Sequence, residues 1–395
     1  MVCASSSTKI IACCIAASLH INLSFRVFSL ADHQYMSLAL RLAEQGLYTT
    51  QPNPRVGCVI VKEGQVIGRG AHLKAGEPHA EVFALREAGE VARGADAYVT
   101  LEPCNHHGRT PPCVDALIKA GVKRVVIAMQ DPNPLVSGRG QNALLQAGIE
   151  VEVGLMEKEA IALNPGFVSV MTQGRPFVRS KIAASMDGKT ALSNGQSQWI
   201  TGAGARQDVQ HWRAQVSAIM TGIGTVLADN PSMTVRLEGV SRQPLRIIVD
   251  SQLQTPLHCK MLSSERLQQC PLLIAYASDP QKIAEQLIAK GAELLQLPNV
   301  QGRVDLNALL QALAQRNITE VLLEAGQGLN GAMQQANLID EFIFYFAPKL
   351  MGSAGHNMLA MDAFTAMSQA VDLQLLDVRQ VGQDIRVRAK PVTKI

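Results

Sequence analysis

Apolar residues recur along this chain in two spacings, one typical of helices and one of strands, which alternate from about residue 32 onward. Met36, Ala39 and Ala43 lie at helical spacing and predict a helix over 35–46. Because short apolar runs then alternate with further helical stretches, we expect an α/β domain whose largely parallel sheet is covered on both faces. The strands predicted up to residue 153 are 56–61, 65–70, 97–101, 124–129 and 149–153, and the helices are 78–88, 114–120 and 142–147.

Two clusters of turn residues, Asn164-Pro165-Gly166 and Gly174-Arg175-Pro176, interrupt this alternation. It then restarts, and at 395 residues the chain is long enough for two domains. We place the domains at 32–173 and 174–395, the second also of α/β class. Its predicted strands are 177–183, 217–222, 245–250, 272–276, 320–324 and 342–347, and its predicted helices are 203–214, 281–290, 305–315 and 328–336.

The first 31 residues do not fit this alternation. Lys9 precedes an apolar run over 10–17, as in a secretory signal peptide. Polar residues from His20 onward interrupt the run too early for a membrane span. A start codon assigned too far upstream would leave a similar extension. We favour this second explanation, because the rest of the chain resembles a cytoplasmic protein, and leave residues 1–31 out of the fold.

Composition narrows the class of protein. Hydrophobic residues make up 47% and charged residues 17%, as is usual for a globular enzyme. A net charge of +3 is too small to indicate nucleic acid or a membrane surface as a partner, and an aromatic content of 4% leaves no series of stacking residues. The eight cysteines form no disulfide framework and fit a reducing cytoplasm. We expect small-molecule substrates, and a homo-oligomer is compatible with these features.

Three side chains with metal-binding chemistry occur close together in the first domain. His79, Cys104 and Cys113 supply one imidazole and two thiols, enough for a zinc site whose fourth position stays open to water. Zinc lowers the pKa of bound water to about 7, and a carboxylate can then move the water's proton. Glu81, two residues after His79, is the candidate for that role. The set resembles the nucleobase deaminases, where such a glutamate is not a metal ligand.

The spacing of His79 and Glu81 constrains their placement. Residues i and i+2 of a regular helix point in nearly opposite directions. Both can therefore face one metal only at an irregular first turn, which Pro78 makes plausible. We also expect Cys113 to open the next helix, whose N-terminus would favour the thiolate of Cys113. A structural zinc site with His106 or His107 as fourth ligand, or two buried cysteines without metal, are the alternatives.

The segment between the two cysteines departs from the general deaminase signature Pro-Cys-x-x-Cys. Here eight residues separate Cys104 from Cys113, and they include His106, His107 and Arg109. These side chains could contact an anionic group of the substrate beside the metal. Alternatively, the segment is a solvated basic loop.

Two glycine-rich loops follow predicted strands in the second domain. They contain Gly222 with Gly224, and Gly326 with Gly328. Such loops let backbone N–H groups meet a phosphate at the start of a helix, but they also occur as simple tight turns. Neither matches Gly-x-Gly-x-x-Gly, so the usual dinucleotide fingerprint is absent.

Several motifs together resemble the bifunctional deaminase/reductase family of riboflavin biosynthesis, from residue 33 to about 390. The family resemblance implies a cytidine-deaminase-like α/β/α domain, followed by a dihydrofolate-reductase-like α/β domain that uses NADPH. The motifs are Pro52-Asn-Pro-Arg-Val-Gly57, Gly70-Ala-His72, His79-Ala-Glu81, Leu101-Glu-Pro-Cys104, His107-Gly-Arg-Thr-Pro-Pro-Cys113 and Asp131-Pro-Asn-Pro134.

The resemblance also implies roles for individual residues. Asn53, His72 and His106 would line the pyrimidine and phosphate pocket of the deaminase. Lys181 would help to orient the ribose in the reductase. The nucleotide would contact Ala183, Trp199, Thr225, Asp229, Ser251 and the loop Gly326, Gln327, Gly328, Leu329, Asn330, Gly331 and Ala332, and the sugar-phosphate substrate would contact Ser197, Arg213, Met233, Arg236 and Glu324.

The resulting hypothesis is two successive steps of riboflavin synthesis on phosphorylated pyrimidines. Zinc-dependent deamination in the first domain precedes NADPH-dependent reduction of the ribosyl chain in the second. Three rivals remain at this point: a polynucleotide deaminase, a zinc-stabilised regulatory protein that senses a nucleotide, and a deaminase whose reductase half has lost its activity.

Overall fold

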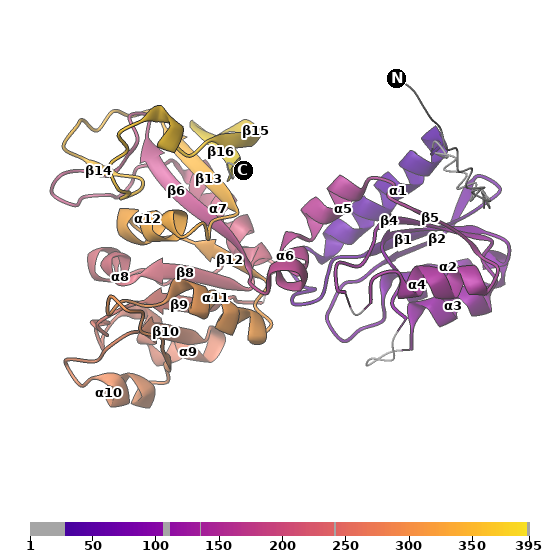
Figure 1. The fold of residues 1–395 in the computed structure, drawn as a ribbon, viewed down its shortest axis with the longest axis horizontal. Helices are drawn as coiled ribbons and strands as arrows, with labels where there is room; N and C mark the ends of the chain where they lie inside the picture. Colours follow the sequence, from indigo (N-terminus) through magenta and orange to yellow (C-terminus); the bar gives the residue numbers. More distant parts are fainter. Residues whose placement is uncertain (1–27, 106–110, 135, 241, 393–395) are drawn as a thin grey trace, which may run out of the picture.

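Alternating strands and helices build two large sheets, one in each half of the chain, as the spacing of apolar residues predicts. The computed structural model describes residues 28–105, 111–134, 136–240 and 242–392. Figure 1 shows them as two lobes with one helix, α6, between the lobes. We call the lobes the N-terminal and the C-terminal domain.

The N-terminal domain contains a five-stranded sheet in the order β2-β1-β3-β4-β5. The three strands β3, β4 and β5 are parallel, but β1 runs antiparallel to both of its neighbours. The sheet is therefore mixed, and the prediction of a largely parallel sheet was wrong here. The strands are β1 (Gly57–Lys62), β2 (Gln65–Ala71), β3 (Asp96–Leu101), β4 (Arg124–Met129) and β5 (Glu150–Val153).

A two-residue turn explains the antiparallel pair. Glu63 and Gly64 both have positive φ, at 51° and 77°. Two positive φ values are the geometry of the tight turn that matches the twist of a hairpin.

Helices cover both faces of this sheet. In Figure 1, α1 and α5 lie on one side of it, and α2, α3 and α4 on the other. The helices are α1 (Leu30–Ala43), α2 (Ala80–Ala88), α3 (Cys113–Ala120), α4 (Arg139–Gln146), α5 (Glu157–Leu163) and α6 (Pro165–Gln173), with short 3-10 turns at Glu44–Gly46 and Gly89–Ala92.

Helix α1 begins before the segment that the apolar spacing predicts. Ser29 caps it, because the Asp32 backbone N–H donates to Ser29 Oγ at 3.1 Å and the Ser29 N–H donates to Asp32 Oδ2 at 2.8 Å. Asp32 also accepts hydrogen bonds from Tyr98 and Arg124 of the sheet. Ser29 and Leu30 are thus tied to the N-terminal domain, although the sequence analysis left them in the extension. The predicted apolar run over 10–17 lies outside the described residues.

The C-terminal domain is built on a nine-stranded sheet in the order β11-β10-β9-β8-β12-β6-β13-β16-β15. Neighbouring strands from β11 to β13 are parallel, and β16 and β15 continue the sheet antiparallel. The strands are β6 (Phe177–Ser185), β8 (Ala218–Gly222), β9 (Leu245–Val249), β10 (Leu272–Tyr276), β11 (Glu293–Gln296), β12 (Glu320–Leu323), β13 (Glu341–Ala347), β15 (Leu373–Val381) and β16 (Asp384–Pro391), while β7 (Lys189–Ala191) and β14 (His356–Asn357) pair separately.

Successive residues of β12 show why this sheet has two covered faces. Val321 and Leu323 belong to one buried cluster and Leu322 to another, so side chains pack on both sides. The covering helices are α7 (Ala203–Gln215), α8 (Ile223–Asp229), α9 (Ser264–Gln269), α10 (Ala284–Ala289), α11 (Leu306–Gln315) and α12 (Gln327–Gln335), with 3-10 turns at Lys260–Leu262 and Met367–Gln369.

The two predicted breaks near the domain boundary have different structures. Asn164 separates α5 from α6, and Pro165 is the first residue of α6, where its missing N–H costs nothing. The chain leaves the first domain only at Gly174, which caps α6 with φ 68°. The first break is therefore a helix junction, and the second leads into β6.

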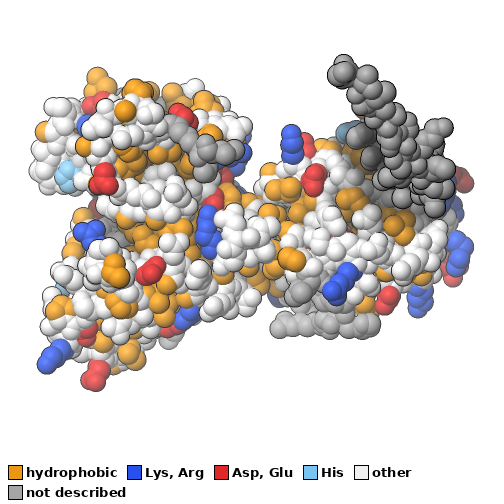
Figure 2. Space-filling model, in the orientation of Figure 1, with side chains coloured by type: hydrophobic (Ala, Val, Ile, Leu, Met, Phe, Trp, Pro, Cys, Tyr) orange, Lys and Arg blue, Asp and Glu red, His pale blue; other side chains and the backbone are white. Residues whose placement is uncertain are grey.

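Surface charges are mixed. Figure 2 shows Lys and Arg side chains interspersed with Asp and Glu over both lobes on the face that it presents. Within residues 28–392, apart from the gaps named above, no helix combines the length and the apolar character that a bilayer span requires.

Candidate active sites

The predicted zinc ligands meet at one end of the N-terminal sheet. His79 Nδ1 lies 3.2 Å from Cys113 Sγ and 3.6 Å from Cys104 Sγ. All three donor atoms lie within 4.8 Å of one another, and no other such cluster occurs among the residues that the structure describes. One imidazole and two thiols at this separation suit Zn²⁺ and leave a fourth position for water. His106 and His107, the two alternatives for a fourth ligand, lie outside the described residues, and so does the predicted role of His106 in the substrate pocket.

The start of α2 resolves the problem posed by the His-x-Glu spacing. His79 is the N-cap, with extended backbone at φ −77° and ψ 166°, so the helix begins at Ala80. Because His79 lies outside the helix, the direction of its side chain is not set by helical geometry. Glu81 lies in the first turn of the helix. The expectation of an irregular first turn is confirmed.

Glu81 is buried beside the ligands. The residue is 3% exposed, and its Oε2 has no hydrogen-bond partner in the described structure. Burial, and next the charge of Cys104, raises the pKa of Glu81. A carboxylate held in this way is poised to accept a proton from a polar group that enters the site, which is the role predicted for it.

The two cysteines differ in their surroundings. Hydrogen bonds from Cys113 and His79, together with the Cys113 backbone N–H at 3.3 Å, lower the pKa of Cys104. The pKa of Cys113 is raised instead, chiefly by its hydrogen bond to Cys104. The backbone N–H of Cys113 at the start of α3 therefore donates to the sulfur of Cys104, and the effect of the helix start on the Cys113 thiolate stays a prediction.

Asn53 and His72 form the wall next to the metal ligands. Asn53 Nδ2 lies 3.2 Å from His72 Nε2, and His72 Nδ1 lies 3.2 Å from the Pro78 carbonyl oxygen. The rings of His72 and His79 meet edge-on, with centroids 5.3 Å apart. Burial lowers the pKa of His72, so a neutral ring can donate to Pro78 and accept from Asn53.

Glu102 is an important residue that the sequence analysis did not assign. Its buried carboxylate accepts backbone N–H groups from Asp131, Gly138, Gly140 and Gln141, at 2.9–3.2 Å. It thereby holds the segment after β4 against the loop that carries Cys104. Glu102 lies in the Leu-Glu-Pro-Cys motif, in which the cysteine could be recognised as a metal ligand from the sequence. The role of Glu102 depends on backbone contacts with a distant segment, which the sequence does not reveal.

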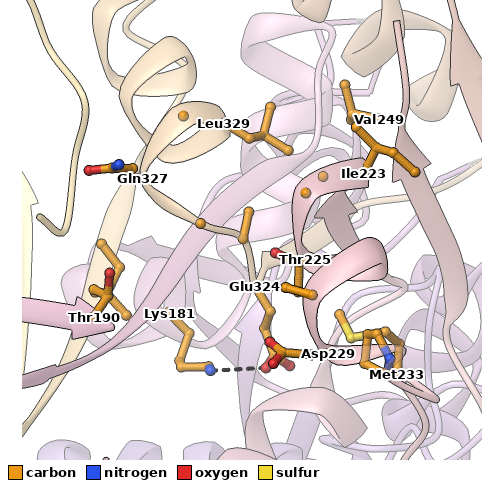
Figure 3. Close-up of a pocket in the computed structure, with 18 of the residues that line it drawn as sticks. Lys181, Thr190, Ile223, Thr225, Asp229, Met233, Val249, Glu324, Gln327 and Leu329 are labelled. Atoms are coloured by element: carbon orange, nitrogen blue, oxygen red, sulfur yellow. Dashed lines mark ion pairs between the residues drawn. The ribbon is translucent and has the colours of Figure 1, made fainter. Parts of the chain in front are cut away.

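A cavity of about 1730 Å³ lies in the C-terminal domain, at the carboxyl ends of β8, β9 and β12. Ligands of open α/β sheets bind at this kind of place. Figure 3 shows Gln327 and Leu329 of α12 on one side of it and Thr225 with Asp229 of α8 on another. The predicted residues that line it are Lys181, Ala183, Ser197, Trp199, Arg213, Thr225, Asp229, Met233, Arg236, Ser251, Glu324, Gly326, Gln327, Gly328, Leu329 and Ala332.

The glycine-rich loop before α12 fits a nucleotide cofactor. A Cβ at Gly328 would meet nothing within 4 Å, so this loop leaves open space at the helix start. Backbone N–H groups at such a start suit the phosphates of NADPH. The cavity is also large enough for a dinucleotide and a second ligand together.

Two predicted cofactor residues do not reach the cavity. Asn330 is 1% exposed, accepts a hydrogen bond from Ser180 Oγ at 2.8 Å and donates to the Ala325 carbonyl oxygen at 2.8 Å. Gly331 packs against the backbone of Ala360, and a Cβ added to Gly331 would come within 1.9 Å of the Ala360 carbonyl oxygen. Both residues hold the loop in place, because α12 turns them toward the protein interior.

Glu324 is the charged centre of the cavity floor. Arg213 donates to both of its oxygens, at 2.6 and 3.0 Å, and Lys181 Nζ lies 3.0 Å from Oε2 (Figure 3). Burial alone would raise the pKa of Glu324, but the two cations more than offset it and lower the pKa to about 2. Arg213 also donates to the Thr234 carbonyl oxygen. This arginine therefore positions Glu324.

Arg236 and Arg206 present their charges differently. Arg236 is exposed in the cavity, and the structure gives its guanidinium no hydrogen bond or ion pair within the described residues. Arg206, which was not assigned, lies over the Trp199 ring with its Cζ 4.7 Å from the centroid. Arg206 and Trp199 together form one wall of the cavity. In the sequence, the only indication of this contact is that Arg206 lies on a helix predicted to begin shortly after Trp199.

Comparison with known proteins agrees with both sites. Residues 176–387 match the family described as RibD C-terminal domain, and residues 30–129 match the cytidine and deoxycytidylate deaminase zinc-binding region. The chain is 48% identical to the riboflavin biosynthesis protein RibD of Escherichia coli, over 90% of this chain and 98% of that protein. The chain belongs to the RibD family. The RibD of Bacillus amyloliquefaciens is 43% identical, over 91% and 96% of the two chains.

Solved RibD structures have the same two-domain fold. That of Acinetobacter baumannii RibD is 49% identical with a TM-score of 0.84, and the match covers 92% of this chain and 99% of that one. The deaminase/reductase of Thermotoga maritima is 33% identical with a TM-score of 0.81 and the same coverage. The present chain is accordingly a bifunctional enzyme of riboflavin biosynthesis, with a zinc-dependent deaminase domain and an NADPH-dependent reductase domain.

Proposed function

We propose that the N-terminal domain deaminates 2,5-diamino-6-(5-phosphoribosylamino)pyrimidin-4-one, and that the C-terminal domain reduces the ribosyl chain of the resulting 5-amino-6-(5-phosphoribosylamino)uracil to ribityl. The convergence of His79, Cys104 and Cys113 on one point, beside a buried carboxylate oxygen without a partner, carries the first half of this proposal. The second half rests on the cavity with its glycine-rich loop and its charged floor.

The residues divide the work of the first reaction. His79, Cys104 and Cys113 would hold zinc, which would make a bound water acidic near neutral pH. Glu81 would take one proton of that water as the water oxygen bonds to the ring carbon, and give this proton to the ring nitrogen. Glu81 would then take the second proton from the same oxygen, which becomes the carbonyl oxygen, and give it to the departing amine. The C–N bond breaks, and ammonia leaves. Asn53 and His72 border the site and orient the pyrimidine.

In the second reaction the protein chiefly binds and orients. NADPH, when bound, would supply a hydride to C1′ of the opened ribosyl chain, and a proton from solvent would complete the reduction at the nitrogen. The loop from Gly326 to Leu329, with Ala332, Thr225 and Ser251, holds the cofactor. Lys181, Glu324 and Arg236 contact the sugar-phosphate on the cavity floor and rim.

The decisive experiment is an assay of the purified chain with the diaminopyrimidine, with and without NADPH. We expect ammonia release in both cases, and NADPH oxidation only after ammonia has been released. Treatment with a zinc chelator should abolish ammonia release, while NADPH oxidation with the deaminated substrate continues. Absence of ammonia release from zinc-loaded enzyme would refute the proposal for the first domain, and absence of NADPH oxidation that for the second.

Arg236 should bind the substrate phosphate. A charge-assisted hydrogen bond contributes about 1.5–3 kcal/mol, so Arg236→Ala should raise the reductase KM for the phosphorylated substrate by about 10–100-fold. The KM for NADPH should change little. Steady-state kinetics with each ligand varied in turn measures both values, and Arg236→Lys should recover part of the loss. Equal increases for both ligands would contradict the assignment.

We also propose that the enzyme works in the cytoplasm as a homo-oligomer. The thiols of Cys104 and Cys113 must stay reduced to bind zinc, which favours the cytoplasm.

Edge strand β15 exposes Leu375, Leu376 and Val378 to 46–63%, and a second copy could pair with this edge. Light scattering should give a multiple of the monomer mass, and Leu375→Lys should reduce it to the monomer. A monomeric wild type would refute the oligomer.

A further inference from the structure

Buried polar side chains connect the two domains. Four side chains, Gln51, Arg55, Asn164 and Glu320, form what we call the interdomain clamp. Gln51 is half-buried, and the other three are buried. Gln51, Arg55 and Asn164 belong to the deaminase domain, and Glu320 is the first residue of β12 in the reductase domain. Such residues are rarely buried unless they are fully paired.

An ion pair forms the centre of the clamp. Arg55 Nη1 lies 2.9 Å from Glu320 Oε1, and the two residues are 4% and 2% exposed. Arg179 of β6 contacts the other oxygen of Glu320. Burial alone would raise the pKa of Glu320, but Arg55 and Arg179 lower it, so the carboxylate is charged. Because both groups are desolvated, removal of either one would leave an uncompensated buried charge, which is strongly destabilising.

Gln51 uses all the hydrogen-bonding groups of its amide across the interface. Its Nε2 donates to Glu320 Oε1 at 3.0 Å and to the Gln215 carbonyl oxygen at 3.3 Å. Its Oε1 accepts from the hydroxyls of Ser217 and Thr319. All four partners belong to the reductase domain, so this single side chain is held by four contacts to the other half of the molecule.

The junction between α5 and α6 secures the opposite side of Arg55. Asn164 Oδ1 accepts from the Arg55 backbone N–H at 2.7 Å, and its Nδ2 donates to the Arg55 carbonyl oxygen at 2.9 Å. A Cβ at Gly166 would come within 2.3 Å of Glu320 Cγ. The glycine thus lets α6 approach Glu320 closely, which accounts for the Asn-Pro-Gly break in the sequence.

The clamp holds the segment that forms one wall of the deaminase site. Asn53 lies between Gln51 and Arg55 in the chain, and its side chain meets His72 Nε2 at 3.2 Å. We propose that the clamp sets the position of Asn53, so that Glu320 of the reductase domain is a positioning residue for deamination. This inference rests on the proposed function, in which Asn53 contacts the pyrimidine.

The reductase site lies at the other end of the same strand. Glu320 begins β12, whereas Glu324 follows its last residue and lies in the cavity. Of the two, only Glu324 lines the cavity. A change at Glu320 should therefore affect the distant deaminase site more than the reductase site of its own domain.

The test compares Glu320→Gln with Glu341→Gln. Glu341 is also buried and also pairs with Arg179, at 3.1 Å, but its other partner is Arg388 of the same domain. We expect Glu320→Gln to raise the deaminase KM by about tenfold, with zinc content unchanged and reductase kcat within about twofold. Glu341→Gln should leave the deaminase KM unchanged.

Several outcomes overturn the inference. It fails if Glu320→Gln leaves the deaminase KM unaltered, or if Glu341→Gln raises it equally. Loss of zinc or a fall in kcat alone would show general damage. If Glu320→Gln yields no reductase activity and so is misfolded, Ser217→Ala, which removes one donor to Gln51, decides by the same comparison. A wild type that releases no ammonia would refute the proposed function first.

Discussion

Replacing Glu81 with Gln is expected to slow ammonia release by about 10²–10⁴-fold, the usual contribution of a general acid–base group. The amide is similar in size to the carboxylate but cannot take the proton of the attacking water. Zinc content should remain equal to that of the wild type, because Glu81 is not one of the three clustered ligands. An ammonia assay beside metal analysis on the same sample measures both quantities.

Glu77→Gln is the matched control for this prediction. Glu77 lies four residues earlier, is exposed, and its replacement removes the same charge from the same segment. It should retain full deaminase activity. Turnover by Glu81→Gln close to that of the wild type would show that another group moves the proton. Loss of zinc would instead assign Glu81 a structural role at the site.

Replacing Arg213 with Ala is expected to destabilise the reductase domain by about 3–5 kcal/mol, because it leaves the buried Glu324 carboxylate with Lys181 as its only cation. Reduction should also be lost, since Glu324 would no longer be held in the cavity. Denaturant unfolding, followed by a probe in the C-terminal domain, measures the first effect. Arg316→Ala provides the control, because Arg316 pairs with Glu293 on the surface and should contribute at most about 1 kcal/mol.

The same pair predicts a dependence of stability on pH. The pKa of Glu324 falls from its ordinary value of 4.5 to about 2 in the folded protein. A lowered carboxyl pKa stabilises the folded state above the unfolded value, here by about 3 kcal/mol, and this contribution disappears as the pH falls from 4.5 through 2. The wild type should therefore lose stability over that range more steeply than Arg213→Ala. Parallel profiles for the two proteins would contradict the assignment.

The deaminase site could be predicted from sequence because its residues lie in short motifs with distinctive chemistry. A histidine and two cysteines within 35 positions have few other functions, and a strand–helix alternation brings such loops to one end of a sheet. The orientation of His79 could not be predicted with the same certainty. It depends on the extended backbone of an N-cap, which only the start of α2 fixes.

The residue roles that could not be predicted from the sequence depend on contacts between distant segments. Arg213 and Arg236 look equivalent as phosphate ligands, but only the fold reveals that Glu324 neutralises one of them. Asn330 and Gly331 belong to the same loop as Gly328, yet the turn of α12 directs them inward. Strands β15 and β16 were missed, because polar or charged residues interrupt both and leave no continuous apolar run of strand length.

The strand order of the reductase sheet has a consequence for synthesis on the ribosome. Strand β6 pairs with β12 and β13, both of which follow it by well over a hundred residues. At about 5–20 residues per second, the emerging β6 waits on the order of ten seconds for its neighbours. The strands of the N-terminal sheet have all been translated by Val153. The nascent chain can therefore complete its metal-binding half while β6 of the other half still lacks both of its neighbouring strands.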